Sequence, residues 1–89
     1  MDFLVRSPRQ FRHVRAYADS LMSGATLMVS FDAVDSAMKN RIFDYLNGVS
    51  YIIGATVSKV SENLLMYAPN HVEVDKEAVK KSTRSWLGR

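Results

Sequence analysis

The chain has 89 residues, of which 47% are hydrophobic, and this fits one globular domain and excludes a disordered chain. It has no cysteine, which excludes disulfides, thiolate metal sites and thiol nucleophiles and fits a reducing cytoplasm. The net charge of +3 is uneven, since residues 1–75 sum to −1 and residues 76–89 sum to +4. We therefore expect a core domain over residues 1–75 and a solvated basic tail or short helix over residues 76–89.

The N-terminal third predicts a strand, a helix and a second strand. Residues 2–6 contain Phe-Leu-Val, which is typical of a short strand. Ser7-Pro8 predicts a helix start, because serine is a favoured N-cap and proline suits the first helical turn. Gly24 predicts the end of this helix. Between these signals, apolar residues recur at steps of three and four, as on one helix face: Phe11, Val14, Ala18 and Leu21.

Residues 25–31 form a nearly unbroken apolar run, which indicates a strand covered on both faces in the middle of a sheet. A strand, a helix and a strand in this order favour a right-handed crossover that leaves the first two strands parallel. No apolar run is long enough to cross a bilayer, and the N-terminus lacks the apolar core of a secretory signal.

A second helix is predicted over residues 37–52. Asp32, Asp35 and Ser36 precede it, and we interpret the two carboxylates as helix caps rather than as an acid–base pair. The apolar stripe of this helix is too wide for a single contact, so the helix is expected to pack on two sides. The stripe comprises Met38, Ile42, Phe43, Tyr45, Leu46, Val49, Ile52 and Ile53.

Gly48 lies inside this predicted helix, where glycine costs roughly 1 kcal/mol relative to alanine. Two explanations stay open at this point. Close approach by another helix would favour the missing side chain, or Gly48 could begin the end of the helix.

The chain then predicts a hairpin of residues 56–60 and 64–68 around a loop at residues 61–63. Residues 71–74 alternate in polarity and predict a short edge strand, and residues 76–87 would form only a marginal helix. The predicted fold is therefore an α/β two-layer sandwich in β-α-β-α-β-β-β order, with a mixed sheet and two main helices.

Residues typical of catalysis are missing from the sequence. The four glycines form no phosphate-binding loop, and no nucleophile motif occurs. His13 and His71 are far apart, with no carboxylate at ligand spacing. We therefore predict no enzyme activity, no metal and no cofactor. Arg9, Arg12 and Arg15 are interpreted as a solvated helix face rather than a nucleic-acid site, since the body is net negative.

Several segments resemble the SepF family of cell-division proteins, and together they cover about residues 3–75. RIFDYLNG at residues 41–48 is similar to the family's RIVDFLSG, and YIIG at residues 51–54 to its YAIGG. SPRQF at residues 7–11, with ADSL at 18–21, resembles the first family helix. ATLMVSF at residues 25–31 matches its buried strand. The closing hairpin and last strand match at residues 58–60 and 64–74.

The resemblance implies a cytoplasmic, non-catalytic adaptor at the division septum, on the inner face of the membrane. Family members bind the C-terminal peptide of FtsZ and link FtsZ filaments to the membrane. They work as homodimers through the second helix, with higher polymers left open. The amphipathic membrane helix of the family has no counterpart in these 89 residues, so membrane contact would come only through a segment outside them.

The resemblance also implies site residues. The family pocket for the FtsZ peptide holds a basic residue, which matches Lys59, and an aromatic residue, whose place is taken here by Leu65. We predict Lys59, Leu65 and Tyr67 as the peptide-binding residues; Leu65 keeps an apolar contact but lacks the ring, and the sequence does not reveal the effect on affinity or peptide preference. The predicted dimer interface comprises Ile42, Tyr45, Gly48 and Val49.

Two other functions remain as alternatives. One is a small-molecule regulatory domain of ferredoxin-like type, although such domains run βαββαβ. The other is a nucleic-acid-binding module that would use the arginines of the first helix and the basic tail.

Overall fold

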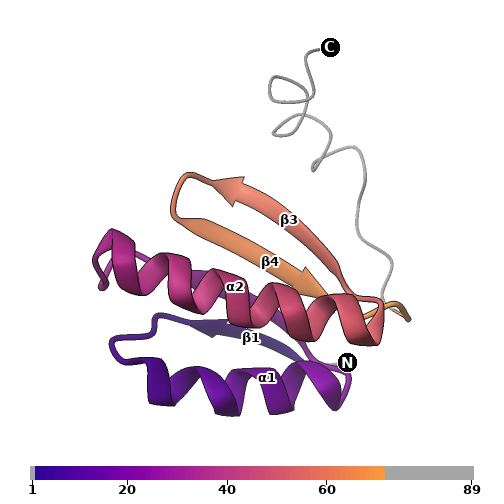
Figure 1. Ribbon diagram of the computed structural model, residues 1–89. Helices are drawn as coiled ribbons and strands as arrows, with labels where there is room; N and C mark the ends of the chain where they lie inside the picture. Colours follow the sequence, from indigo (N-terminus) through magenta and orange to yellow (C-terminus); the bar gives the residue numbers. More distant parts are fainter. Residues whose placement is uncertain (1, 72–89) are drawn as a thin grey trace.

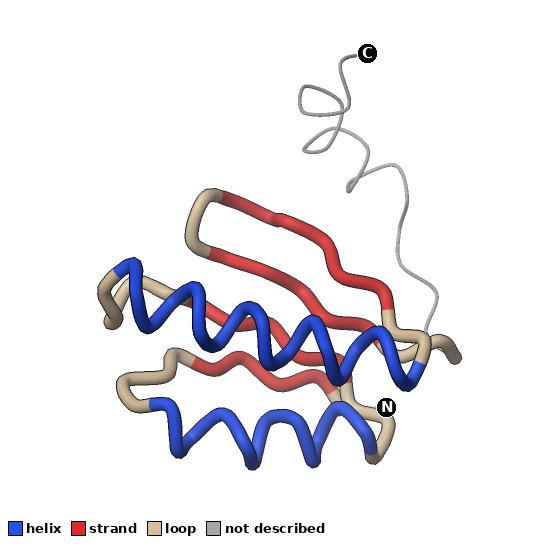
Figure 2. The backbone as a smooth tube through the Cα atoms, in the orientation of Figure 1, coloured by secondary structure: helices blue, strands red, loops and turns tan. Residues whose placement is uncertain are grey.

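The computed structural model describes residues 2–71, which fold into one sheet covered by two helices (Figures 1 and 2). Both helices lie on the same face of the sheet. The strands are β1 (Phe3–Arg6), β2 (Thr26–Ser30), β3 (Thr56–Ser61) and β4 (Leu64–Ala68). The helices are the 3-10 turn η1 (Phe11–His13), α1 (Val14–Met22) and α2 (Ser36–Ile53). His71 lies in a turn, and the rest of the predicted last strand and terminal helix falls outside the described residues.

The sheet has the strand order β1-β2-β4-β3 and is mixed. β1 and β2 are parallel, which confirms the predicted crossover through α1. β4 is antiparallel to β2 on one side and to β3 on the other, which confirms the predicted hairpin. Because both helices precede this hairpin, the element order differs from βαββαβ, and the ferredoxin-like architecture is excluded.

The core lies between the sheet and the helices. Alternate residues of β2 and β4 point toward the helices, as the two-residue period of a strand requires. Burial of each large apolar side chain contributes about 1.5–3 kcal/mol, so this layer supplies most of the stabilisation. The residues that the two helices and two central strands contribute to the core cluster are Val14, Ala18, Leu21, Leu27, Val29, Ile42, Leu46, Leu65 and Tyr67.

The first helix begins later than the sequence predicted. Residues 7–10 are not helical, and Gln10, which precedes η1, has an extended backbone with φ −141° and ψ 149° and makes no side-chain cap. Pro8 is fully buried, so this segment packs against the core instead of starting a helix. The predicted helix end is confirmed, since Gly24 has a φ of +104° that favours glycine.

Both ends of α2 are fixed by local interactions. The Asp35 carboxylate accepts a hydrogen bond of 2.8 Å from the Met38 amide, which confirms it as the N-cap. At the other end, Gly54 has a φ of +74° and forms a left-handed C-cap. The prediction for Asp32 was wrong, because its carboxylate accepts a 3.2 Å hydrogen bond from the Ser30 hydroxyl and does not cap α2.

Replacing Asp35 by alanine should therefore destabilise the fold more than replacing Asp32. Asp35→Ala removes the acceptor for a helix amide, and the free energy of unfolding should fall by about 1 kcal/mol. Asp32→Ala removes only an exposed hydroxyl contact and should have a much smaller effect. Urea denaturation at neutral pH measures both. Equal losses would contradict the assignment of Asp35 as the cap.

Candidate functional site: a cavity between α2 and the β3–β4 hairpin

A cavity of about 530 Å³ lies between α2 and the hairpin. Its walls are mostly apolar, with one ammonium group and one amide. The lining residues are Phe43 and Asn47 from α2, Val57 and Lys59 from β3, and Leu65 from β4.

The local structure explains why these side chains meet. Phe43 and Asn47 are four residues apart and therefore share one side of α2. Val57 and Lys59 are two residues apart on β3 and therefore point to the same face of the sheet. Lys59 is also the register partner of Leu65 on β4, so the two side chains stand next to each other. Lys59 can extend its aliphatic stem along this apolar surface while its ammonium group reaches solvent.

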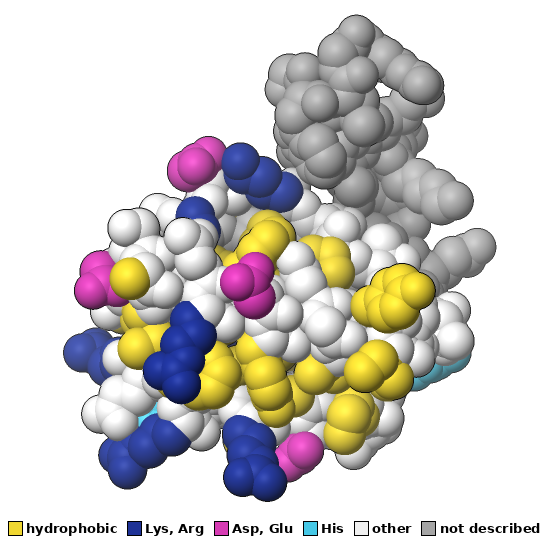
Figure 3. Space-filling view, viewed as in Figure 1, with side chains coloured by type: hydrophobic (Ala, Val, Ile, Leu, Met, Phe, Trp, Pro, Cys, Tyr) yellow, Lys and Arg dark blue, Asp and Glu magenta, His cyan; other side chains and the backbone are white. Residues whose placement is uncertain are grey.

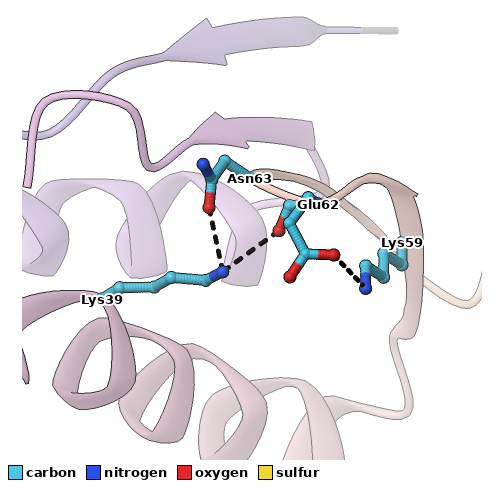
Figure 4. Close-up of polar contacts among 4 residues, drawn as sticks. All are labelled: Lys39, Lys59, Glu62 and Asn63. Atoms are coloured by element: carbon cyan, nitrogen blue, oxygen red, sulfur yellow. Dashed lines mark hydrogen bonds and ion pairs between the residues drawn. The ribbon is translucent and has the colours of Figure 1, made fainter. Parts of the chain in front are cut away.

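The Lys59 ammonium group already has a partner inside the chain. Its Nζ lies 3.0 Å from a carboxylate oxygen of Glu62, in the turn between β3 and β4 (Figure 4). This hydrogen bond to Lys59 lowers the pKa of Glu62 below its ordinary value of 4.5, and the charges of Lys59 and Lys39 add to the effect. The resulting stabilisation is present above pH 4.5 and is lost as the pH falls through the lowered pKa. It is small, since the Glu62 side chain is 82% exposed.

A second lysine holds the tip of the hairpin. Lys39 Nζ, near the start of α2, donates to the Glu62 carbonyl at 3.1 Å and to Asn63 Oδ1 at 3.0 Å (Figure 4). The Phe31 amide, in the loop after β2, donates to the Asn63 carbonyl at 2.8 Å. These bonds tie the turn to two other parts of the fold, and we call Lys39 and its two acceptors the hairpin latch.

Two other polar groups near the site lack partners within the described residues. Asn47 Oδ1 is covered without a hydrogen-bond donor, although Asn47 lines the cavity. Tyr67 Oη is likewise covered and unpaired, and burial raises the pKa of this phenol. The tyrosine is fully buried in the core and does not line the cavity. This corrects its prediction as a contact residue, since the side chain presents no surface to a ligand.

The structure thus brings together two of the predicted peptide-binding residues, Lys59 and Leu65. The sequence did not identify Phe43, Asn47 or Val57 as site residues. The alternation on β3 could have indicated Val57, which lies two residues before Lys59. Nothing in the sequence indicates which side of the wide α2 stripe faces the hairpin.

Three of the four predicted dimer-interface residues retain exposed surface on α2. Gly48 is exposed, with open space where a side chain would project. Tyr45 is 37% exposed and makes an edge-on ring contact with Phe11 at 5.4 Å between ring centres. Val49 is half-buried. Ile42, in contrast, is completely buried in the core of the single chain, which removes it from the predicted interface.

The face formed by the two helices carries many hydrophobic side chains (Figure 3). On α2, one row of exposed residues runs along the helix at steps of three and four: Arg41, Tyr45, Gly48 and Ile52. Ile52 is 82% exposed, and the neighbouring Tyr51 is 88% exposed. The C-terminal half of α2 therefore exposes apolar side chains that the sheet does not cover, whereas Arg41 and Asp44 make the exposed side of its N-terminal half polar.

Within residues 2–71, no group of three or more histidine or acidic side chains is arranged to hold a metal ion. A smaller cavity of about 230 Å³ near the end of α1 is lined partly by Asp2 and Asp19. None of the described helices is long and apolar enough to cross a membrane.

Fold and site together define a small two-layer α/β domain with a cavity suited to binding, between a helix and a hairpin. Residues 4–74 match the family model described as Cell division protein SepF. The chain therefore belongs to the SepF family, and this membership supports a role in cell division.

Individual relatives agree with this assignment. The chain is similar to the cell division protein SepF of Carboxydothermus hydrogenoformans, with 32% identity over 77 residues that cover 86% of this chain and 56% of the relative. It is 28% identical over 74 residues to SepF of Heliobacterium modesticaldum, covering 83% of this chain and 45% of the relative. The chain thus spans about half the length of these curated relatives.

A solved structure supports the fold. The SepF-like protein from Archaeoglobus fulgidus superimposes with a TM-score of 0.76, covering 85% of this chain and 94% of the other. Sequence identity is only 12%, so this likeness concerns the arrangement of helices and strands.

The hairpin latch generates a prediction. Lys39→Met keeps the length of the side chain but removes both of its hydrogen bonds to the turn. Amide hydrogen exchange at Phe31 and Asn63 should become several-fold faster, while the global free energy of unfolding should fall by no more than about 1 kcal/mol. Exchange monitored by NMR in both proteins measures the difference. Unchanged exchange at the turn would show that the latch does not hold the hairpin.

Proposed function

We propose that this domain is a cell-division adaptor that binds the C-terminal peptide of FtsZ in the cavity between α2 and the hairpin. It acts as a homodimer through the exposed side of α2. It connects FtsZ filaments to the inner face of the membrane through a segment outside these 89 residues. The proposal combines the membership in the SepF family with the geometry of the site.

The observation that carries the proposal is the shared cavity of Lys59 and Leu65. These two positions match the basic and aromatic residues of the family pocket, and they come from different strands. A cavity of about 530 Å³ falls within the range of roughly 300–1,000 Å³ typical of ligand sites. Its apolar walls suit aliphatic side chains of a peptide, and the ammonium group suits a carboxylate on the same peptide.

The chemistry of the lining favours binding over catalysis. The five lining side chains are two aliphatic groups, one aromatic ring, one amide and one ammonium group. An activated nucleophile needs a base within hydrogen-bond distance, and this set contains no such pair. The lysine is instead engaged by Glu62.

The proposed site is tested by measuring binding of an FtsZ C-terminal peptide by calorimetry or fluorescence anisotropy. Lys59→Glu should weaken binding about tenfold or more, because it places a carboxylate where a cation should meet the peptide. Arg15→Glu, on the exposed side of α1, changes the charge equally and should have little effect. Leu65→Ala should also weaken binding. Because Leu65 is only 6% exposed, this substitution also lowers the folding stability of the domain, so the free energy of unfolding of the variant is measured in parallel.

If the wild type binds the peptide and both Lys59→Glu and Leu65→Ala bind it with the same affinity, the peptide binds elsewhere on the domain. No binding by the wild type would reject FtsZ as the partner of this domain.

The proposed dimer has its own test. A side chain at Gly48 meets no atom within 4 Å in the single chain, so Gly48→Lys should fold normally. It should nevertheless weaken the dimer strongly, because it places a long cation in the contact between two helices. Ala16→Lys, at an exposed position of α1, is the matched control. Light scattering at micromolar concentration measures the mass, and a monomeric wild type would rule out the dimer.

A further inference from the structure

The cation of the proposed site is already occupied by a carboxylate of the same chain. Lys59 Nζ and the Glu62 carboxylate are 3.0 Å apart, within the range of a charge-assisted hydrogen bond. Glu62 lies in the turn, three residues after Lys59, and its side chain is largely exposed. A carboxylate arriving from a ligand would meet Lys59 only in competition with Glu62 or beside it.

We propose that Glu62 is an intramolecular competitor for Lys59, which an acidic side chain of the bound peptide displaces. Glu62 thereby sets both the affinity of the cavity and its preference for ligands that carry a carboxylate. This inference rests on the proposed function, because it assumes that a peptide occupies the cavity through Lys59.

The turn can release the Glu62 side chain without losing its shape. The hairpin latch uses the main-chain carbonyl of Glu62 and the side chain of Asn63, and neither bond involves the Glu62 carboxylate. Figure 4 shows the two lysines on opposite sides of Glu62, each bound to a different part of it. Exchange of the carboxylate therefore requires rotation of one exposed side chain, not opening of the hairpin.

The energetic balance permits this exchange. An exposed ion pair contributes little, because water screens the attraction and two long side chains lose rotamer freedom. A ligand carboxylate held over apolar walls meets Lys59 at a lower local dielectric, which strengthens their attraction, and apolar contacts of the same peptide offset the hydration that the carboxylate loses. While Glu62 remains nearby, however, its charge also repels an incoming carboxylate. Removing the Glu62 charge ends both the competition for Lys59 and the repulsion of the ligand carboxylate. We therefore expect it to tighten binding.

The test compares Glu62→Gln with the wild type, using the same FtsZ C-terminal peptide. Glu62→Gln keeps the main-chain carbonyl that Lys39 binds and removes only the negative charge. The dissociation constant should fall about threefold to tenfold at low ionic strength, and the gain should shrink as salt is added. Asp19→Asn is the matched control: it makes the same change in net charge on α1, next to the smaller cavity, and should leave binding unchanged.

A double-mutant cycle locates the effect at Lys59. In a Lys59→Met background, Glu62→Gln should tighten binding much less than in the wild-type background, because the group for which Glu62 competes is missing and only the repulsion between carboxylates remains. NMR titration of the Glu62 carboxyl gives a second measurement. Its pKa should rise toward 4.5 when saturating peptide takes over Lys59.

The outcomes separate the two levels of inference. If the wild type binds the peptide and Glu62→Gln binds no more tightly, the competitor role is rejected while the proposed function stands. An equal gain from Asp19→Asn would assign the effect to net charge and would also reject the competitor. Absence of binding by the wild type would reject the proposed function itself, and the competitor with it.

Discussion

The packing of α2 across the central strands is the constraint on which the rest of the structure depends. Ile42 and Leu46 enter the same core as Leu65 and Tyr67, and they fix the rotation of the helix about its axis. Once this rotation is set, Phe43 must face the hairpin. The cavity and the exposed row along α2 are therefore two results of one packing arrangement.

The same arrangement explains how much the sequence could predict. All four described strands and both helices were expected, because their apolar periods are regular and their turns carry glycine or short polar loops. The start of α1 was misplaced because Ser7-Pro8 is a strong local signal. Burial of Pro8 outweighs that signal, and only the tertiary structure reveals it.

The site was predictable in part. Similarity to the family pointed to Lys59 and Leu65, which line one cavity. Periodicity alone could not separate the core side of α2 from its outer side, because the stripe is apolar around much of the helix. Ile42 was consequently assigned outward, although it is buried. Tyr67 was predicted as a peptide-binding residue beside Leu65, and the sequence could not reveal that it is completely buried.

The hairpin latch binds the main-chain carbonyl of Glu62 and makes no bond to the carboxylate of that residue. Mutations at this position can therefore change the charge at the rim of the cavity while the turn keeps its geometry. If the proposed site binds a peptide as inferred, single substitutions at this position would adjust the strength of binding at little cost in folding stability.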